Sequence, residues 1–183
     1  MGAELERLLT ARSLDERAKD IAGKPRDLLA IREYSDDLAS DFYAINAEWI
    51  ESMFALEEKD RELLAHPREK IVDPGGVILF VESAKLGVVG TCALMKVEER
   101  VFELTKMGVL ERARGRRAGE LLLEAALARA STMDIETLYL LTSSKCVAAI
   151  HLYEKLGFRH DAEIMHKYGS AYARCDVAMR YRP

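Results

Sequence analysis

Three consecutive segments decide the fold of this 183-residue chain: Leu104-Thr-Lys-Met-Gly-Val-Leu110, Glu111-Arg-Ala-Arg-Gly-Arg-Arg-Ala-Gly119 and Glu120-Leu-Leu-Leu-Glu-Ala-Ala-Leu-Ala-Arg129. The first is an apolar run of the kind found in β-strands. The second is rich in arginine and glycine, and the third has apolar residues at helical spacing. We therefore expect a strand, a loop and a helix in this order.

The start of that helix predicts an anion-binding site. A helix N-terminus presents backbone N–H groups that lack intrahelical partners, together with the positive end of the helix dipole. Glycines let the backbone approach a bulky ligand closely, and arginines add positive charge and forked donors. The arginines of this loop are at positions 112, 114, 116 and 117. We expect a ligand that carries a phosphate or pyrophosphate.

Two motifs resemble the GNAT family of N-acetyltransferases. Arg114-Gly-Arg-Arg-Ala-Gly119 matches the first and last positions of the family's acyl-CoA signature, Gln/Arg-x-x-Gly-x-Gly/Ala, with Arg117 at the middle glycine. Ala149-Ile-His-Leu-Tyr-Glu-Lys-Leu-Gly-Phe158 resembles the later Asn-x-x-Ala-x-x-Leu-Tyr-x-x-x-Gly-Phe, with Cys146 at the asparagine. The motifs stand in the family's order, and the resemblance runs from about Leu28 to Arg182.

The resemblance implies an α/β fold with a mixed, mostly antiparallel central sheet flanked by helices. Residues 26–183 would form the acyl-CoA N-acyltransferase domain, and residues 1–25 a helical N-terminal extension. Hydrophobic periodicity predicts strands and helices along the domain. The expected strands are Leu28–Tyr34, Val77–Val81, Gly87–Val97, Phe102–Leu110, Thr137–Thr142, Phe158–Ile164 and Ala173–Arg182. The expected helices are Leu38–Trp49, Glu57–Glu69, the one after the arginine loop, and Cys146–Leu156.

Acetyl-CoA is the co-substrate that the resemblance implies. Backbone groups of Met107 and Val109 would run along its pantetheine arm, and the arginine loop would cradle its pyrophosphate. The loop residues in this role are Arg114, Gly115, Arg116, Arg117, Ala118 and Gly119, with Cys146 added from the second motif. A thiol is a poorer hydrogen-bond partner than the family's amide. Arg117 can stand in place of the family's glycine if its side chain points outward and its φ is negative.

Two residues are catalytic candidates. Glu103 lies on the strand that leads into the loop, where many family members carry a glutamate that deprotonates the amine. Tyr153 occupies the family's tyrosine, whose hydroxyl serves the departing thiolate. Each also has a purely structural interpretation, because Glu103 could be an exposed strand residue and Tyr153 a core aromatic on a buried helical stripe.

The acceptor would be a small-molecule or peptide amine, held between the first two helices and the final strands. Aromatic side chains could line that space, and a nearby glutamate could attract a cationic amine. The candidates are Trp49, Phe54, Tyr168, Tyr172, Glu48 and Glu51.

Composition limits the partners and the compartment. A formal net charge of -4 does not favour nucleic acid or an anionic membrane, and no segment is apolar enough to span a bilayer. The three cysteines form no Cys-x-x-Cys pair, and no signal peptide is evident, so we expect a cytoplasmic protein. The four histidines lack metal-ligand spacing, so no metal is expected. Dimers are common in the family, which leaves a homodimer open.

We therefore predict an N-acetyltransferase that moves an acetyl group from acetyl-CoA to a primary amine by direct attack. One alternative is a catalytically silent acyl-CoA-binding or regulatory module, suggested by Arg117 and Cys146 at departures from the family motifs. Another is a nucleotide-binding protein. That alternative requires an acidic ribose ligand about twenty residues beyond a glycine loop, and the strand after this helix ends without one.

Overall fold

The structure is a computed structural model and describes residues 27–182, so the extension predicted to be helical, residues 1–25, lies outside the described residues. The elements follow one another as β1 Leu29–Glu33, α2 Ala39–Met53, α3 Glu58–Ala65, β2 Val77–Ser83, β3 Gly87–Glu98, β4 Val101–Val109, α4 Ala118–Ala130, β5 Thr137–Thr142, α5 Val147–Lys155, β6 Phe158–His160, α6 Ala162–Tyr168 and β7 Val177–Tyr181. None of the helices in this described part has the length and apolar character that crossing a membrane requires.

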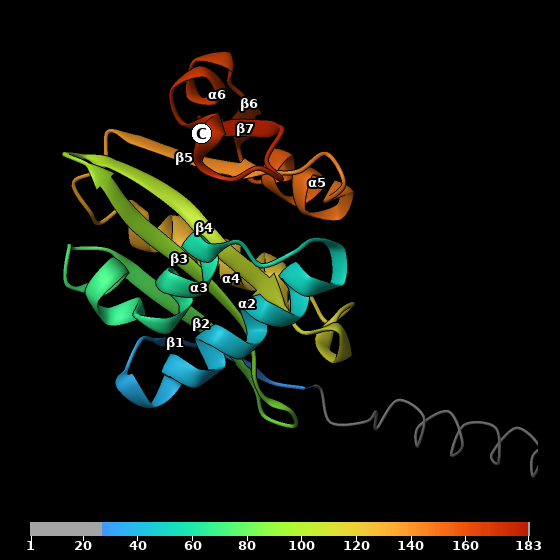
Figure 1. Cartoon of the computed structure of the whole chain (residues 1–183). Coiled ribbons are helices and arrows are strands. Elements are labelled where there is room, and N and C mark those ends of the chain that lie inside the picture. The colour runs from blue at the N-terminus through green and yellow to red at the C-terminus, as the bar shows by residue number, and fades with distance from the viewer. Residues whose placement is uncertain (1–26, 183) are drawn as a thin grey trace, which may run out of the picture.

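One seven-stranded sheet, in the order β1-β2-β3-β4-β5-β7-β6, forms the middle layer of the protein (Figure 1). Neighbouring strands are antiparallel except β4 and β5, which run parallel. The predicted α/β class with a mostly antiparallel sheet is therefore confirmed. The expected strands Val77–Val81, Gly87–Val97 and Phe102–Leu110 correspond to β2, β3 and β4, which form an antiparallel meander.

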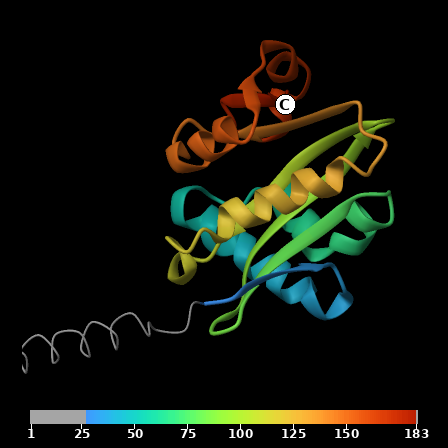
Figure 2. The same ribbon diagram turned by 180° about the vertical axis from the view of Figure 1, so that it is seen from behind.

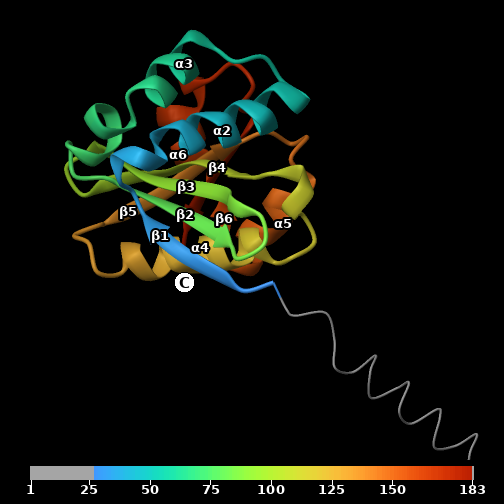
Figure 3. The same cartoon turned by 90° about the horizontal axis from the view of Figure 1, so that it is seen from below.

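Helices cover both faces of the sheet. α2 and α3 lie on one face, and α4 and α5 lie on the other, as the views from behind and from below show (Figures 2 and 3). Alternation along β2 explains the two cores, because successive strand residues face opposite sides. Val77, Leu79 and Val81 pack in the cluster that contains the buried face of α4, whereas Ile78 and Phe80 pack with α2 and α3.

Two predicted elements differ from the structure. The expected helix Glu57–Glu69 is divided, because α3 ends at Ala65 and a separate π-helical turn follows at Arg68–Val72. The expected strand Phe158–Ile164 is wrong beyond His160. The chain there turns into α6, since Asp161 caps the new helix by accepting a hydrogen bond from the backbone N–H of Ile164 at 3.0 Å.

A bulge in β4 reorients the strand at the centre of the sheet. Thr91 pairs with Gly108 and Ala93 pairs with Thr105, so Cys92 alone faces both Lys106 and Met107. Lys106 has a φ of 49°, the left-handed conformation that accommodates the extra residue. Because of the bulge, Thr105 and Lys106 do not alternate between faces. The Lys106 side chain instead contacts α3.

The same region of β4 separates from β5. The parallel pairing comprises Val101 with Thr137, Phe102 with Leu138 and Glu103 with Tyr139. Beyond that point β4 continues to Val109 and β5 to Thr142, and the two strands diverge (Figure 1). The divergence leaves the edge of β4 from Thr105 onward without a strand partner on the β5 side, within residues 27–182.

Candidate active site

A large groove begins where β4 and β5 diverge. Its volume is about 1560 Å³, which includes open solvent. The groove reaches from the arginine loop, across the unpaired edge of β4, to the start of α5. The predicted co-substrate residues that line it are Met107, Val109, Arg114, Gly115, Arg117, Ala118, Gly119 and Cys146. Residues from two separate motifs thus share one groove.

The arginine loop ends in a helix N-terminus that is open to a ligand. No side chain caps the start of α4, and the helical hydrogen bonds begin with the backbone N–H of Leu121, which donates to the carbonyl of Arg117 at 3.0 Å. Gly115 has a φ of 76°, a backbone conformation that side chains disfavour. Gly119 lies beside Met107 and Val109, where a Cβ would only touch their side chains. A side chain longer than methyl would therefore intrude on the groove.

Two arginines of the loop differ from expectation. Arg117 has a φ of 62°, so the condition of a negative φ is not met, and the residue adopts the left-handed conformation that glycine accepts most readily. Its exposed guanidinium pairs with Glu120 at 2.9 Å, in agreement with an outward side chain. Arg116 does not line the groove, because it pairs with Asp27 at 2.6 Å. Arg114 lines the groove and has no ion-pair partner among the described residues.

Gly108 shapes the floor of the groove. A Cβ at this position would lie 2.2 Å from Cδ1 of Trp49, so only glycine lets the indole pack against the β4 backbone. The indole is held in place by a hydrogen bond of 3.0 Å from Nε1 to the Asn46 side chain. Trp49 therefore connects α2 to the divergent part of β4.

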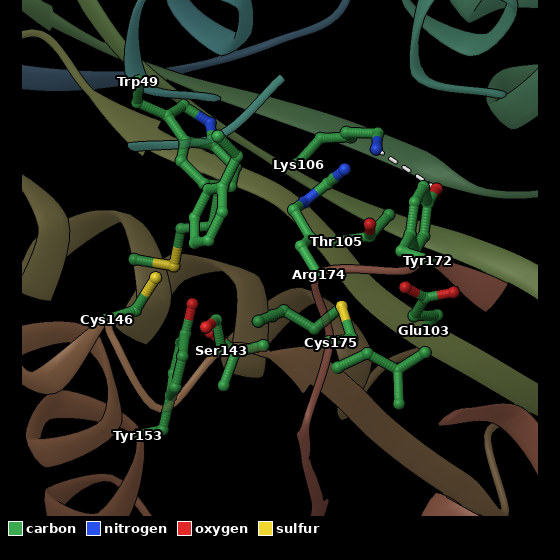
Figure 4. A pocket seen from close by; sticks show the side chains of 15 residues that line it. Trp49, Glu103, Thr105, Lys106, Ser143, Cys146, Tyr153, Tyr172, Arg174 and Cys175 are labelled. Carbon is green, nitrogen blue, oxygen red and sulfur yellow. Dashed lines mark hydrogen bonds between the residues drawn. The ribbon is translucent and has the colours of Figure 1, made fainter. Parts of the chain in front are cut away.

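A second, smaller pocket lies beside the groove, with a volume of about 520 Å³ that includes open solvent. The two cavities adjoin, because they share five lining residues: Trp49, Met107, Thr142, Cys146 and Tyr153. Most of the other side chains that line the small pocket come from β4, from the end of β5 and from the segment before β7, among them Glu103, Lys106 and Arg174 (Figure 4). A long ligand in the groove could therefore present one end to a small ligand in the pocket.

Tyr153 lies at the junction of the two cavities. Its ring belongs to the core, where it meets Phe158 edge to face at a centroid distance of 5.9 Å. Its hydroxyl points towards the cavity and has no hydrogen-bond partner among the described residues (Figure 4). Burial raises the pKa of this phenol, so it stays protonated at neutral pH. The residue combines a packing role with an available proton donor.

Glu103 lies on the wall of the small pocket, at the last position of β4 that pairs with β5. It is only 4% exposed, which excludes the alternative interpretation of Glu103 as an exposed strand residue. Burial raises the pKa of its carboxyl group, and the positive charge of Lys106 and the Thr105 side chain partly counteract that rise. A carboxylate in such surroundings holds a proton more readily than one in water.

The expected acceptor residues are only partly brought together. Trp49, Phe54 and Tyr172 line the small pocket, as predicted. Tyr168 was predicted wrongly, because its ring stacks on Tyr139 and its hydroxyl donates to Glu98 at 2.9 Å. The predictions for Glu48 and Glu51 are also wrong. Both are exposed on α2 and line neither cavity.

Three charged residues were not anticipated from the sequence. Lys106 and Arg174 line the small pocket, and Asp60 on α3 binds both of them from behind. Burial alone would raise the pKa of Asp60, but hydrogen bonds from Arg174 and Lys106 outweigh it and hold the pKa at about 2. The one available signal was a lysine in the middle of a largely apolar strand that also carries Glu103.

Comparisons with known proteins agree with this geometry. Residues 32–158 match the family model described as "Acetyltransferase (GNAT) family". A GNAT-family acetyltransferase from Staphylococcus aureus Mu50 superposes with a TM-score of 0.73 at 19% identity, covering 84% of this chain and 98% of the other. No curated protein sequence matches the chain.

Two further solved structures share the fold. A ribosomal-protein-alanine N-acetyltransferase from Brucella melitensis has a TM-score of 0.65 at 20% identity, covering 84% of this chain and 99% of the other. A spermidine N-acetyltransferase from Vibrio cholerae, solved with CoA and spermine, has a TM-score of 0.61 at 19% identity, covering 84% and 94%. Similarity at this level establishes the fold and leaves the acceptor undetermined.

Proposed function

The chain belongs to the GNAT family of acetyltransferases and is therefore an acyltransferase, and from this premise we propose that it moves an acetyl group from acetyl-CoA to a primary amine by direct attack. One observation carries the proposal. The groove below the arginine loop adjoins a pocket whose walls hold both a buried carboxyl group and a phenol without a hydrogen-bond partner among the described residues. Such a connection is what transfer between a long and a small substrate requires.

Three parts of the groove suit three parts of acetyl-CoA. The uncapped start of α4 and the Arg114 guanidinium offer donors and positive charge to a pyrophosphate. The unpaired edge of β4 at Met107 and Val109 offers backbone groups to the amides of a pantetheine arm. Cys146, at the N-cap of α5, lines the junction where the thioester would lie. Arg116, tied to Asp27, contributes charge from outside the groove.

The chemistry then needs a base and an acid. The amine nitrogen attacks the thioester carbonyl, the carbon–sulfur bond breaks, and the amine loses a proton while the thiolate gains one. Glu103 takes the proton from the amine, directly or through water, and Tyr153 donates a proton to the sulfur. Glu103 lies on β4 in the wall of the small pocket and Tyr153 lies on α5 at the junction, and this separate placement fits the opposite tasks.

The alternative of a silent acyl-CoA-binding module rested on Arg117 and Cys146. Arg117 adopts a left-handed conformation, and its side chain pairs with Glu120 on the exposed surface, so the guanidinium leaves the start of α4 open to a ligand. The deciding experiment measures CoA release from acetyl-CoA over a panel of primary amines. Amine-dependent release supports the enzyme, whereas tight acetyl-CoA binding without release under any amine identifies the silent module.

Arg114→Glu should weaken acetyl-CoA binding strongly, because it places a negative charge where the pyrophosphate would lie. Added salt should weaken wild-type binding moderately by screening. Isothermal titration calorimetry provides the measurement. Arg61→Glu, an exposed position on α3, makes the same charge change away from the groove and should bind normally. Unchanged affinity in a folded Arg114→Glu protein would exclude this loop as the phosphate site.

Glu103→Gln should lower turnover and remove the acidic limb of the pH–rate profile, with acetyl-CoA affinity nearly intact. The raised pKa of Glu103 means that wild-type turnover falls as the pH drops through that pKa and the base becomes protonated. The profile is measured at saturating amine. Glu99→Gln, on the exposed turn after β3, should keep the wild-type profile. An acidic limb that persists in Glu103→Gln would assign the base to another group.

A further inference from the structure

The small pocket is lined by positively charged side chains that the proposed function does not explain. Its charged lining residues are Glu103 and two cations, Lys106 and Arg174 (Figure 4). Both cations are almost fully withdrawn from solvent, with side chains 2% and 11% exposed. Both also stack on the ring of Tyr172, at 4.5 Å and 4.6 Å from its centroid. Burying two cations beside one small pocket is costly unless a ligand or partner uses them.

Asp60 neutralises these cations only in part. Its Oδ1 accepts from Lys106 Nζ at 2.7 Å and from Arg174 Nη2 at 2.9 Å. Its Oδ2 accepts from Arg174 Nη1 at 2.6 Å and from the backbone N–H of Glu57 at 3.1 Å. A carboxylate offers about four lone-pair positions. Asp60 is therefore saturated and has no capacity to bind an ammonium group of a substrate.

The cations, in contrast, keep unused donors. An arginine has five N–H donors, and the bonds of Arg174 to Asp60 and Glu57 use three of them. An ammonium group has three donors, and Lys106 uses two of them, for Asp60 and the Tyr172 hydroxyl. The remaining donors belong to side chains that line the pocket. Their natural partner is an anionic group.

Other ionisable groups surround the pair and leave these donors unused. Glu57, outside the pocket lining, adds a second negative charge through its ion pair with Arg174 at 3.1 Å, and it also accepts a hydrogen bond from the backbone N–H of Ala173. Lys59 adds a further positive charge over Tyr172 at 4.9 Å. Burial raises the pKa of Cys175 to about 11, so its thiol is neutral. Glu103 is the one pocket-lining acid within the described chain, and the proposed reaction occupies it with the reacting amine.

We infer that the acceptor is a small amine that carries a carboxylate, an amino acid in the broad sense, with Arg174 and Lys106 as its specificity residues. The inference rests on the proposed function of the same pocket. The amine end lies towards Glu103 and the cavity junction, and the carboxylate meets the unused donors of Arg174 and Lys106. A diamine is disfavoured because its second ammonium group would meet these cations and no free carboxylate.

The test uses matched acceptors. γ-Aminobutyrate, butylamine and putrescine differ only in carrying a carboxylate, a methyl or an aminomethyl group at the far end, and alanine with isopropylamine is a shorter pair. Values of kcat/KM are normalised to the unprotonated fraction of each amine. We expect the anionic member of at least one set to be preferred by about tenfold or more, the effect of a charged hydrogen bond. Preference for the neutral or dicationic member in both sets overturns the inference.

Arg174→Gln keeps a polar side chain and removes the charge. It should bring the ratio of kcat/KM for the anionic acceptor to kcat/KM for the neutral acceptor close to one. A loss of folded protein lowers both values equally and does not change this ratio. Arg61→Gln on α3 should keep the wild-type ratio. An unchanged preference in a folded Arg174→Gln protein overturns the assignment.

Calorimetric titration of the protein–CoA complex with the same amines separates this inference from the proposed function. Tighter binding of the anionic member, lost in Arg174→Gln, supports the anionic specificity even if no amine is acetylated. In that outcome the proposed enzymatic function fails and the binding specificity stands. Equal binding of all members overturns the inference, whatever the turnover.

Discussion

Tyr153→Phe should lower kcat by about a hundred- to ten-thousandfold, the usual contribution of a general acid. The substitution removes only the hydroxyl, which points into the cavity and has no partner among the described residues (Figure 4). The ring and its contact with Phe158 remain. We therefore expect acetyl-CoA affinity and the melting temperature to stay close to the wild-type values. Steady-state kinetics, calorimetry and thermal unfolding provide the three measurements.

Tyr181→Phe is the matched control for this prediction. Tyr181 belongs to the same aromatic cluster, 5.2 Å from Phe158 between ring centroids, but lines neither cavity. Loss of its hydroxyl should leave kcat unchanged. If Tyr153→Phe instead turns over normally and melts at a lower temperature, Tyr153 is a core residue. The thiolate would then leave with help from water or another donor.

Most of the groove could be predicted because its residues lie in two short motifs. The arginine loop and the helix with Tyr153 each have a local pattern, and the strand–loop–helix order places both at one end of the sheet. The backbone conformation of Arg117 could not be read in this way. An arginine in the left-handed region is strained relative to glycine, so the residue type at this position favours a negative φ.

The region after Phe158 shows how a local signal can be missed. Ile164, Met165 and Tyr168 recur at helical spacing, and Asp161 precedes them at the position of an N-cap. The expected strand Phe158–Ile164 nevertheless ran through this segment. The Asp161 cap ends the strand after His160, and Tyr168 consequently packs on Tyr139 rather than entering the acceptor pocket.

Sequence patterns could not predict the cluster of charged residues on the wall of the small pocket. Lys106 and Asp60 are 46 residues apart, and Arg174 and Asp60 are 114 residues apart. Each residue by itself resembles an ordinary surface charge on a helix, strand or loop. Only the bulge in β4 and the packing of α3 against the sheet bring the three together. Periodicity and spacing carry no information about such long-range pairing.

Asp60→Asn should lower the free energy of unfolding by about 3 kcal/mol, because it removes the partner of two buried cations. The asparagine retains the shape of the side chain, so the loss reports charge rather than packing. Chemical denaturation measures the effect. Glu62→Gln on the same helix is the control, since Glu62 pairs with Lys70 at 2.6 Å on the exposed surface. Surface pairs contribute about 0 to 1 kcal/mol.

The same interaction should make the wild-type protein sensitive to acid. The pKa of Asp60 is about 2 in the folded protein, below the ordinary 3.8, so the folded state keeps this carboxylate ionised at a lower pH than the unfolded chain does. Its stabilisation, about 2 kcal/mol, is therefore complete above about pH 4 and is lost as the pH falls from there towards 2. Denaturation series across that range should show this loss in the wild type and a shallower one in Asp60→Asn. Equal slopes, or a mutant as stable as Glu62→Gln at neutral pH, would mean that Asp60 does not hold the two cations. Arg174 and Lys106 would then need another anchor on the pocket wall.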